Sequence, residues 1–255
     1  MSEKIGDIKA ELLRASGIEE YSLFCDKFAE DNRAGVQKLV ETAKKRIAAI
    51  ENEKLRLYEM RSYERLHADK KYICGIDEVG RGPLAGPVYA AAVILPADAE
   101  ILYINDSKKL SEKKREELYQ EIMEKAVSVG IGYSTHERID EINILQATYE
   151  AMAKAVDNLS VKPDILLVDA VHIPQLDMYP QESIIKGDAK SVSIAAASII
   201  AKVTRDRLMT ELDEKYPGYG FAHNKGYGSA DHIEALKKNG PCEIHRRSFI
   251  KNFTS

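Results

Sequence analysis

The sequence has few cysteines, no long apolar run and no apolar segment at its start. Its three cysteines, Cys25, Cys74 and Cys242, are far apart and form no CxxC or Cys/His pattern. This scarcity argues against a zinc site or a disulfide framework and fits the reducing cytosol. The longest apolar runs, such as residues 90–95, are far too short to span a bilayer. Because residues 1–11 are charged and lack the apolar stretch of a signal peptide, we expect a soluble, cytoplasmic protein without membrane association.

The sequence also lacks an excess of positive charge. Its 37 basic and 41 acidic residues give a net charge of −4, so no global positive field indicates a nucleic-acid partner. Nucleic-acid binding would have to come from local basic patches, which an acidic site elsewhere can mask in the total. A chain of 255 residues with 44% hydrophobic and 31% charged residues is typical of globular proteins. We expect one main domain with an appendage.

Residues 1–70 are expected to form a helical N-terminal extension. Apolar residues recur at helical spacing over residues 5–13, over a second short segment at 21–28, and over one long amphipathic segment from 33 to 65. A helix of more than 25 residues is expected to pack on a partner or on a domain surface. A coiled coil is the alternative, although the heptad pattern is not kept. No chemistry is assigned to this extension.

Residues 71–255 alternate between apolar strand-like segments and helical segments, which predicts an α/β domain with a C-terminal helical segment. The expected strands cover residues 72–77, 88–95, 127–134, 165–170 and 183–189. The expected helices cover residues 111–126, 143–159, a segment after residue 189 that is rich in small residues, and 229–239. Ser111 is the expected N-cap of the first of these helices.

Residues 72–88 contain the most informative stretch of the chain. An apolar strand leads there to Asp77 and Glu78, and a turn rich in glycine and proline follows, with Arg81 between two glycines. Side chains alternate along a strand, so both acids can reach one site only near its end, where the turn re-aims the second. Carboxylates beside exposed amides and one arginine suit a metal ion next to a phosphodiester. A strand that ends in a solvated turn is the alternative.

Two further strands are expected to end in acids, at Asp169 and at Asp188, in addition to Asp77 and Glu78. Ligand sites of α/β sheets gather where strand ends converge, so the four acids are expected to meet. Like charges raise each other's pKa, and divalent cations relieve that conflict. Oxygen ligands without His or Cys favour Mg²⁺ or Mn²⁺. Two such ions can activate a water and stabilise the leaving oxygen of a phosphodiester. An N-cap or a solvated turn is the alternative for each acid taken alone.

Several motifs in this chain together resemble those of ribonuclease HII. They are GIDEVGRGPLAGPV at residues 75–88, DSKKLS at 106–111, LLVDA at 166–170, residues 185–207, and HNKGYGSADH at 223–232. The resemblance covers roughly residues 72–250 and leaves the helical extension without a role. It implies an RNase H-like fold with a central mixed sheet flanked by helices. It also implies cleavage of the RNA strand of RNA–DNA hybrids and nicking 5′ of a ribonucleotide embedded in duplex DNA.

The resemblance also implies roles for individual residues. The family's four metal-binding carboxylates correspond to the four acids named above. Its Gly-Arg-Gly loop, which senses the 2′-OH at an RNA–DNA junction, corresponds to Gly80, Arg81 and Gly82. The tyrosine that stacks on the neighbouring deoxyribose corresponds to Tyr227. A 2′-OH can donate and accept hydrogen bonds, and an aromatic ring can stack on a sugar, so these residue types suit the roles. For Tyr227 alone, a packed loop tyrosine is the alternative.

Basic residues are distributed as a surface that follows a nucleic-acid backbone requires. They are Lys108, Lys109, Lys113, Lys114, Arg115, Lys186, Lys190, Lys225, Arg246 and Arg247. We expect Lys108, Lys186 and Lys225 to contact substrate, because each lies in a motif loop. A solvated surface is the alternative for any one of them.

The sequence-based hypothesis is therefore a monomeric, metal-dependent endoribonuclease acting on RNA–DNA hybrids and on ribonucleotide-containing duplex DNA. Ribonuclease HIII is a related possibility, but it carries lysine in the glycine loop, and Arg81 favours HII. Two rival hypotheses are a two-metal DNA nuclease or phosphatase, and a non-catalytic nucleic-acid-binding module. The choice between Mg²⁺ and Mn²⁺ and the role of the extension stay open.

Overall fold

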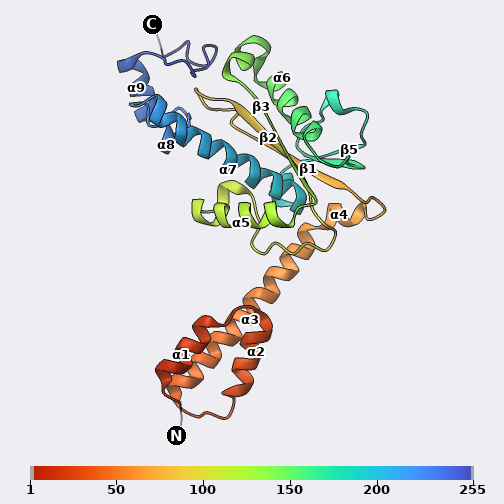
Figure 1. Ribbon diagram of the computed structural model, residues 1–255, viewed down its shortest axis with the longest axis vertical. Coiled ribbons are helices and arrows are strands. Elements are labelled where there is room, and N and C mark those ends of the chain that lie inside the picture. The colour runs from red at the N-terminus through yellow and green to blue at the C-terminus, as the bar shows by residue number, and fades with distance from the viewer. Residues whose placement is uncertain (1–2, 254–255) are drawn as a thin grey trace. The chain divides into compact units, whose positions relative to one another are not determined.

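The computed structural model describes residues 3–253 and contains two compact units, one within residues 1–59 and one within residues 60–255 (Figure 1). The first unit holds α1 (Ile5–Arg14), α2 (Gly17–Lys27) and all but the last residue of α3 (Ala34–Met60). These helices share one apolar core, formed by Ile8, Leu12, Tyr21, Phe24, Phe28, Val36, Val40 and Ala43. The helical nature of the N-terminal extension is confirmed, and its limit at residue 70 remains a prediction.

The second unit is built on a five-stranded mixed sheet with the strand order β3-β2-β1-β4-β5. The strands are β1 (Ile73–Val79), β2 (Val88–Ile94), β3 (Ser128–Ser134), β4 (Ile165–Asp169) and β5 (Gln181–Ile184). β2 pairs antiparallel with β1 and β3, whereas β4 pairs parallel with β1 and β5. The expected α/β domain with a mixed sheet is confirmed.

Five α-helices follow the first strands of the second unit. They are α5 (Glu112–Lys125), α6 (His136–Asp157), α7 (Val192–Lys215), α8 (Phe221–Asn224) and α9 (Ala230–Asn239). Ser111 caps α5 as expected, because its Oγ accepts a hydrogen bond from the Lys114 N–H over 3.3 Å. No helix within residues 3–253 combines the length and the apolar character needed to cross a bilayer.

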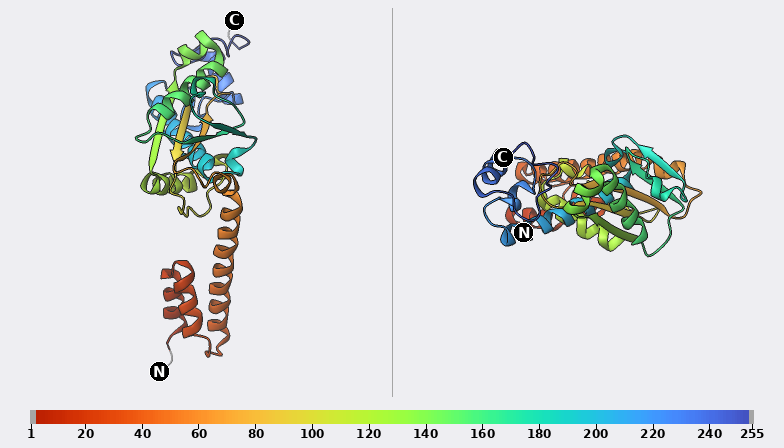
Figure 2. Two further views of the ribbon diagram at one scale, coloured as in Figure 1. Left: turned by 90° about the vertical axis from the view of Figure 1, so that its right-hand side faces the viewer. Right: turned by 90° about the horizontal axis from the view of Figure 1, so that it is seen from above.

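Helices α6 and α7 cover opposite faces of the sheet (Figures 1 and 2). A Cβ atom on Gly75 of β1 would overlap with the backbone of Ser193 in α7. On β3, a Cβ atom on Gly132 would overlap with the Ala151 carbonyl of α6. These glycines let both helices lie against the strands, and α7 thereby comes close to the strand that carries Asp77.

Two expectations about strand ends are wrong. β1 continues to Val79, so Asp77 and Glu78 lie inside the strand, paired with residues of β2. β5 ends at Ile184, and Asp188 lies instead in the 3₁₀ turn η3 (Gly187–Ala189). The strand cannot continue through Lys186, whose φ of 59° is left-handed.

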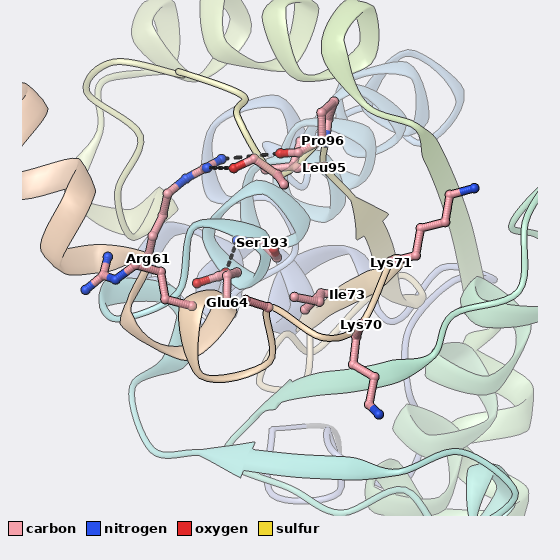
Figure 3. Close-up of a pocket in the computed structure, with 11 residues that line it drawn as sticks. Arg61, Glu64, Lys70, Lys71, Ile73, Leu95, Pro96 and Ser193 are labelled. Atoms are coloured by element: carbon pink, nitrogen blue, oxygen red, sulfur yellow. Dashed lines mark hydrogen bonds between the residues drawn. The ribbon is translucent and has the colours of Figure 1, made fainter.

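The short helix α4 (Ser62–Leu66) fixes the start of α7. Glu64 Oε1 accepts hydrogen bonds from Ser191 Oγ over 2.6 Å and from the Ser193 N–H over 2.9 Å. Figure 3 shows Glu64 directed toward Ser193, and Arg61 reaching the loop after β2, where it donates to main-chain carbonyls such as that of Pro96. The hollow of about 180 Å³ that these residues line contains none of the site residues expected from the sequence. Its contacts are structural: Glu64 satisfies an amide at the N-terminus of α7.

Candidate active site

Asp77, Glu78 and Asp169 lie on two neighbouring parallel strands. Ile76 of β1 pairs with Val168 of β4, so the residues that follow, Asp77 and Asp169, leave the pairing at the same level of the sheet. Apolar runs place both strands in the interior, and the acids come where each run ends. Parallel pairing between β1 and β4 thus places Asp77 and Asp169 at the same level of the sheet.

Asp188 reaches the same edge through a turn that is held by Asp169. The Gly187 N–H donates to Asp169 Oδ1 over 2.7 Å, which ties η3 to the end of β4. Asp188 is then 8% exposed. The pKa of Asp188 is raised first by burial and then by the nearby carboxylates of Asp106 and Asp169. The turn therefore gathers acids that repel one another.

Burial and like charge also act on the two acids of β1. Asp77 is 5% exposed, and this burial raises its pKa well above the ordinary value. The charges of Glu78 and Asp169 raise the pKa of Asp77 further, against a hydrogen bond from Ser198 of α7 that lowers it. The pKa of Glu78 is likewise raised, mainly by burial, although Arg81 opposes the shift. A bound cation would relieve this repulsion.

Asp106 is a fifth acid of the cluster, and sequence reasoning missed it. After burial, the charge of its carboxylate is the largest cause of the raised pKa of Asp188. Asp106 Oδ1 also accepts from the Lys108 N–H over 2.9 Å, which caps the 3₁₀ turn η1 (Ser107–Lys109). Asp106 could have been found from the sequence, because it is the first residue of the DSKKLS motif. Only Lys108 of that motif was included in the expected site.

Lys108 is one of the basic residues that the structure brings to the acids. Burial alone would lower the pKa of its amine, but the carboxylates of Asp77, Asp106, Asp188 and Asp169 outweigh burial and raise it. Lys108 is therefore a firmly charged ammonium group in the field of the cluster.

The other two lysines expected to contact substrate lie in different surroundings. Lys186 is exposed on the turn before Asp188, in a left-handed backbone conformation. Lys225 is half-buried, and its Nζ donates to Thr210 Oγ1 on α7 over 2.8 Å. Neither lysine makes a contact that identifies a phosphate site, so the substrate role of both remains a prediction.

The oxygen atoms of the acids are of the type that a hard divalent ion prefers, but their side chains are not arranged around a single point. Among residues 3–253, no three His, Cys, Asp or Glu side chains are placed to hold a metal ion together. Part of the oxygen set makes other hydrogen bonds, since Asp77 Oδ1 accepts from the Glu78 N–H over 2.8 Å. Glu78 Oε2 is buried and has no hydrogen-bond partner in the described part of the chain. An all-oxygen donor set with an unsatisfied carboxylate oxygen has the chemistry that Mg²⁺ or Mn²⁺ prefers.

The Gly-Arg-Gly loop begins directly after β1. Gly80 has a φ of +89°, and a Cβ atom there would overlap with the Arg205 side chain, so this position requires glycine. Gly82 is different, because the nearest atom to a Cβ placed there is Tyr227 Cε1 at 3.8 Å. Within residues 3–253, the N–H groups of Arg81 and Gly82 have no hydrogen-bond partner. Arg81 Nη1 lies 3.3 Å from Glu78 Oε1, which connects the loop to the acids.

Arg246 holds the loop from its inner side. Its guanidinium donates to the carbonyls of Gly86 over 2.9 Å, Arg81 over 2.8 Å and Gly80 over 2.5 Å. Its side chain is 0% exposed, so the expectation that Arg246 belongs to a surface that follows the nucleic-acid backbone is wrong. The reason is that three carbonyls of a distant loop replace water around the guanidinium.

Arg205 of α7 is a second buried cation beneath the same loop. It donates to the carbonyls of Pro87 over 2.9 Å, Lys225 over 2.8 Å and Ala85 over 3.2 Å. Burial, and after it the charge of Arg205, lowers the pKa of Arg246 to about 9, so Arg246 remains protonated near neutral pH. Burial also lowers the pKa of Arg205. Neither forms an ion pair with a carboxylate of the described residues. Sequence reasoning missed this role for both arginines.

Tyr227 lies beside the loop, with 40% of the residue exposed. Its ring is the nearest neighbour of Gly82, and the guanidinium of Arg205 lies 5.9 Å from the ring centroid. The Leu84 N–H donates to the Gly226 carbonyl over 2.8 Å, which joins the segment carrying Tyr227 to the glycine loop. The structure thus brings Gly82 and Tyr227 together, although 145 positions separate them in the sequence.

Two family models match this chain. The model for ribonuclease HII matches residues 74–252, and the model for the ribonuclease HII N-terminal domain matches residues 4–67. The second match covers the helical extension that the motif resemblance left without a family. Ribonuclease HII of Lachnoclostridium phytofermentans is 62% identical over 255 residues, which is 100% of both chains. Ribonuclease HII of Enterococcus faecalis is 54% identical over 250 residues, which covers 97% of this chain and 96% of the relative.

Solved structures share the fold. The PCNA:RNase HII complex from Archaeoglobus fulgidus matches with a TM-score of 0.60 at 31% identity, over 71% of this chain and 96% of that chain. Bst-RNase HIII in complex with Mn²⁺ matches with a TM-score of 0.56 over 77% of this chain and 70% of that chain. Its 18% identity supports a common fold alone. The RNase H-like fold is therefore confirmed, and the chain belongs to the ribonuclease HII family of endoribonucleases.

Proposed function

We propose that this enzyme hydrolyses the RNA strand of RNA–DNA hybrids and nicks duplex DNA 5′ of an embedded ribonucleotide. The observation that carries the proposal is the placement of the exposed Tyr227 ring beside Gly82, on a loop that starts two residues after Glu78. Ribose recognition and phosphodiester chemistry would then occupy adjacent parts of one surface. The family membership supports the same substrates. A monomeric state and a cytoplasmic location remain predictions.

In this proposal Asp77, Glu78, Asp169 and Asp188 hold divalent ions, Mg²⁺ or Mn²⁺ and two in number. The raised pKa values of Asp77, Glu78 and Asp188 support it, because each carboxylate is buried and lies near other carboxylates, and bound cations would stabilise the charged form. When bound, such ions supply an activated water and stabilise the leaving oxygen. The charged amine of Lys108 faces the same cluster and would orient a phosphate oxygen there.

The Gly-Arg-Gly loop would identify the ribose. A 2′-OH needs both a donor and an acceptor, and the free N–H groups of Arg81 and Gly82 can donate to it. The lack of a side chain at Gly82 lets the sugar approach the backbone closely. Tyr227 would stack on the deoxyribose that follows, which distinguishes a junction from continuous DNA.

Cleavage of three matched duplexes tests the proposal. One duplex contains a single ribonucleotide, one contains an all-RNA strand, and one is DNA throughout, each with Mg²⁺, with Mn²⁺ and with a chelator. We expect one metal-dependent nick 5′ of the single ribonucleotide, cleavage of the RNA strand in the hybrid, and intact DNA. Equal cutting of the all-DNA duplex would contradict ribose recognition, and cutting in the chelator would contradict the metal site.

The two loop glycines predict opposite outcomes when each is changed to alanine. Gly82→Ala has room in the protein, so its melting temperature should stay within about 2 °C of wild type. The added methyl group occupies the space proposed for the sugar, so kcat/KM on the single-ribonucleotide duplex should fall about a hundredfold. Gly80→Ala is the matched control, and overlap with Arg205 and a positive φ should cost it roughly 1–3 kcal/mol of stability. Wild-type cleavage by Gly82→Ala would remove the loop from the substrate contact.

A further inference from the structure

Two histidines lie buried behind the segment that carries Tyr227. His232 is in the first turn of α9 and His245 is in the C-terminal segment, and both are 0% exposed. Their ring centroids are 5.3 Å apart, and the rings pack edge-on or tilted against Phe221. Neither residue belongs to the acid cluster, and the reaction proposed above does not use them.

A chain of hydrogen bonds runs through these two rings, and the donors at its start determine its direction. The Cys242 N–H donates to His245 Nδ1 over 3.0 Å, so Nδ1 of the neutral ring carries no proton. His245 Nε2 must then be protonated, and it donates to His232 Nε2 over 3.1 Å. His232 in turn carries its proton on Nδ1, which donates to the Tyr227 carbonyl over 2.8 Å. One pair of neutral tautomers therefore satisfies every bond of the chain.

The surroundings keep both rings in that neutral form. Burial lowers the pKa of His232, and burial together with the repulsion that a protonated His232 would exert lowers the pKa of His245 to about 4. Arg247 and His136 act in the same direction on His245. At neutral pH the chain is intact, because a second proton on either ring would place two N–H donors against each other.

The hydrogen-bond chain ends on the peptide that places Tyr227. The Tyr227 carbonyl also accepts from the Ser229 N–H over 2.8 Å, and Ser229 Oγ accepts from the His232 N–H over 3.3 Å. The Tyr227 carbonyl is thus hydrogen-bonded both to His232 in the first turn of α9 and to Ser229, the residue that caps this helix. The ring on the same residue is exposed and lies beside Gly82.

We propose that His232 and His245 are positioning residues for Tyr227: their directed hydrogen bonds hold its backbone so that its ring stays beside Gly82, ready for the sugar at an RNA–DNA junction. This inference rests on the proposed function, because it assumes that Tyr227 contacts that sugar. The pair touches neither substrate nor acids, so it acts on junction recognition and leaves the hydrolytic step unchanged.

A series of His232 variants separates positioning from mere packing. His232→Phe keeps an aromatic ring against Phe221 but removes both hydrogen bonds, and His232→Asn restores a donor at the place of Nδ1. His232→Gln carries its amide at the place of Nε2 and cannot reach the Tyr227 carbonyl in the same way. For His232→Phe and His232→Gln we expect KM on the single-ribonucleotide duplex to rise about tenfold, with kcat within twofold of wild type. His232→Asn should recover most of the lost affinity, and the Asn and Gln pair suffices if the Phe variant fails to fold.

A double-mutant cycle with Tyr227→Ala completes the test. If the histidines act through Tyr227, adding His232→Gln to Tyr227→Ala should cause no further loss on the single-ribonucleotide duplex. Additive losses, or equal effects of Asn and Gln, would overturn the positioning role. If Tyr227→Ala itself leaves junction cleavage unchanged, the proposed function of Tyr227 fails, and that result is distinct from a failure of the histidine pair alone.

Discussion

Asp77→Asn is expected to remove nearly all metal-dependent cleavage and, in the absence of metal, to make the protein more stable. The substitution removes one negative charge from the carboxylates that would bind the metal ions. Because metal stabilisation of the transition state is worth several kcal/mol, the cleavage rate should fall by roughly a thousandfold. The amide retains an oxygen for the hydrogen bond from the Glu78 N–H. Removal of a buried carboxylate that is repelled by Glu78 and Asp169 should raise stability by about 1 kcal/mol, or about 2–4 °C in melting temperature.

The pH dependence of that stability gain has a definite sign. The folded-state pKa of Asp77 lies well above its ordinary value of 3.8, so between these two values the folded protein binds the proton that the unfolded chain has lost. Metal-free wild-type protein therefore loses stability as the pH rises through this window. The advantage of Asp77→Asn should be present near neutral pH and vanish below about pH 3.8.

Thermal unfolding with and without Mg²⁺ or Mn²⁺ measures both the change in stability and the loss of metal binding. Metal should raise the melting temperature of the wild type, because it binds the folded state, and should raise that of Asp77→Asn much less. Asp157→Asn, at an exposed position at the end of α6, is the matched control and should leave both responses unchanged. Undiminished metal stabilisation of Asp77→Asn, or retained cleavage, would remove Asp77 from the ligand set.

Arg246→Met is expected to destabilise the protein strongly. The methionine fills much of the same space but leaves the carbonyls of Gly80 and Gly86 buried without their donor. Each unsatisfied buried group costs about 1–3 kcal/mol. Relief of repulsion with Arg205 offsets part of this cost, so we expect a net loss of about 3 kcal/mol, or about 6–12 °C.

The same substitution should also weaken ribose recognition more than it weakens metal binding. Without Arg246 the loop from Gly80 to Gly82 is no longer held against the C-terminal segment, so its free N–H groups lose their fixed direction. The rate of cleavage of the single-ribonucleotide duplex, measured well below the melting temperature, is therefore expected to fall. The rise in melting temperature that metal causes should stay closer to its wild-type value. Arg247→Met is the control for stability, because Arg247 is the exposed neighbour in sequence. An Arg246→Met protein as stable as Arg247→Met would contradict the role of the buried guanidinium.

Local patterns were sufficient for most of the elements in this protein. Continuous apolar runs predicted β1, β2 and β4, and helical spacing predicted the three helices of the extension. Ser111 was recognised as an N-cap, because the preference of serine for that position depends on its own neighbouring amides. Such features depend on interactions within a few residues, so a short stretch of sequence is enough to predict them.

The acids illustrate where local patterns stop. Asp77 and Asp169 could be paired from the sequence alone, because both follow apolar runs of an α/β domain. The position of Asp188 near the cluster could not be predicted from the sequence, since it depends on a left-handed Lys186 and on the hydrogen bond from Gly187 to Asp169. Asp106 was missed for the same reason: its proximity to Asp188 follows from two loops that are 82 positions apart in the sequence.

By itself, the sequence therefore determined the α/β class, the helical extension, the family motifs and the candidate acids. Only the tertiary structure decided which charged residues face solvent and which support the loop. Arg246 resembles Arg247 in the sequence, yet its hydrogen bonds reach carbonyls 160, 165 and 166 positions away. A guanidinium is buried only where enough acceptors replace its water, and the chain assembles those acceptors only when the fold is complete.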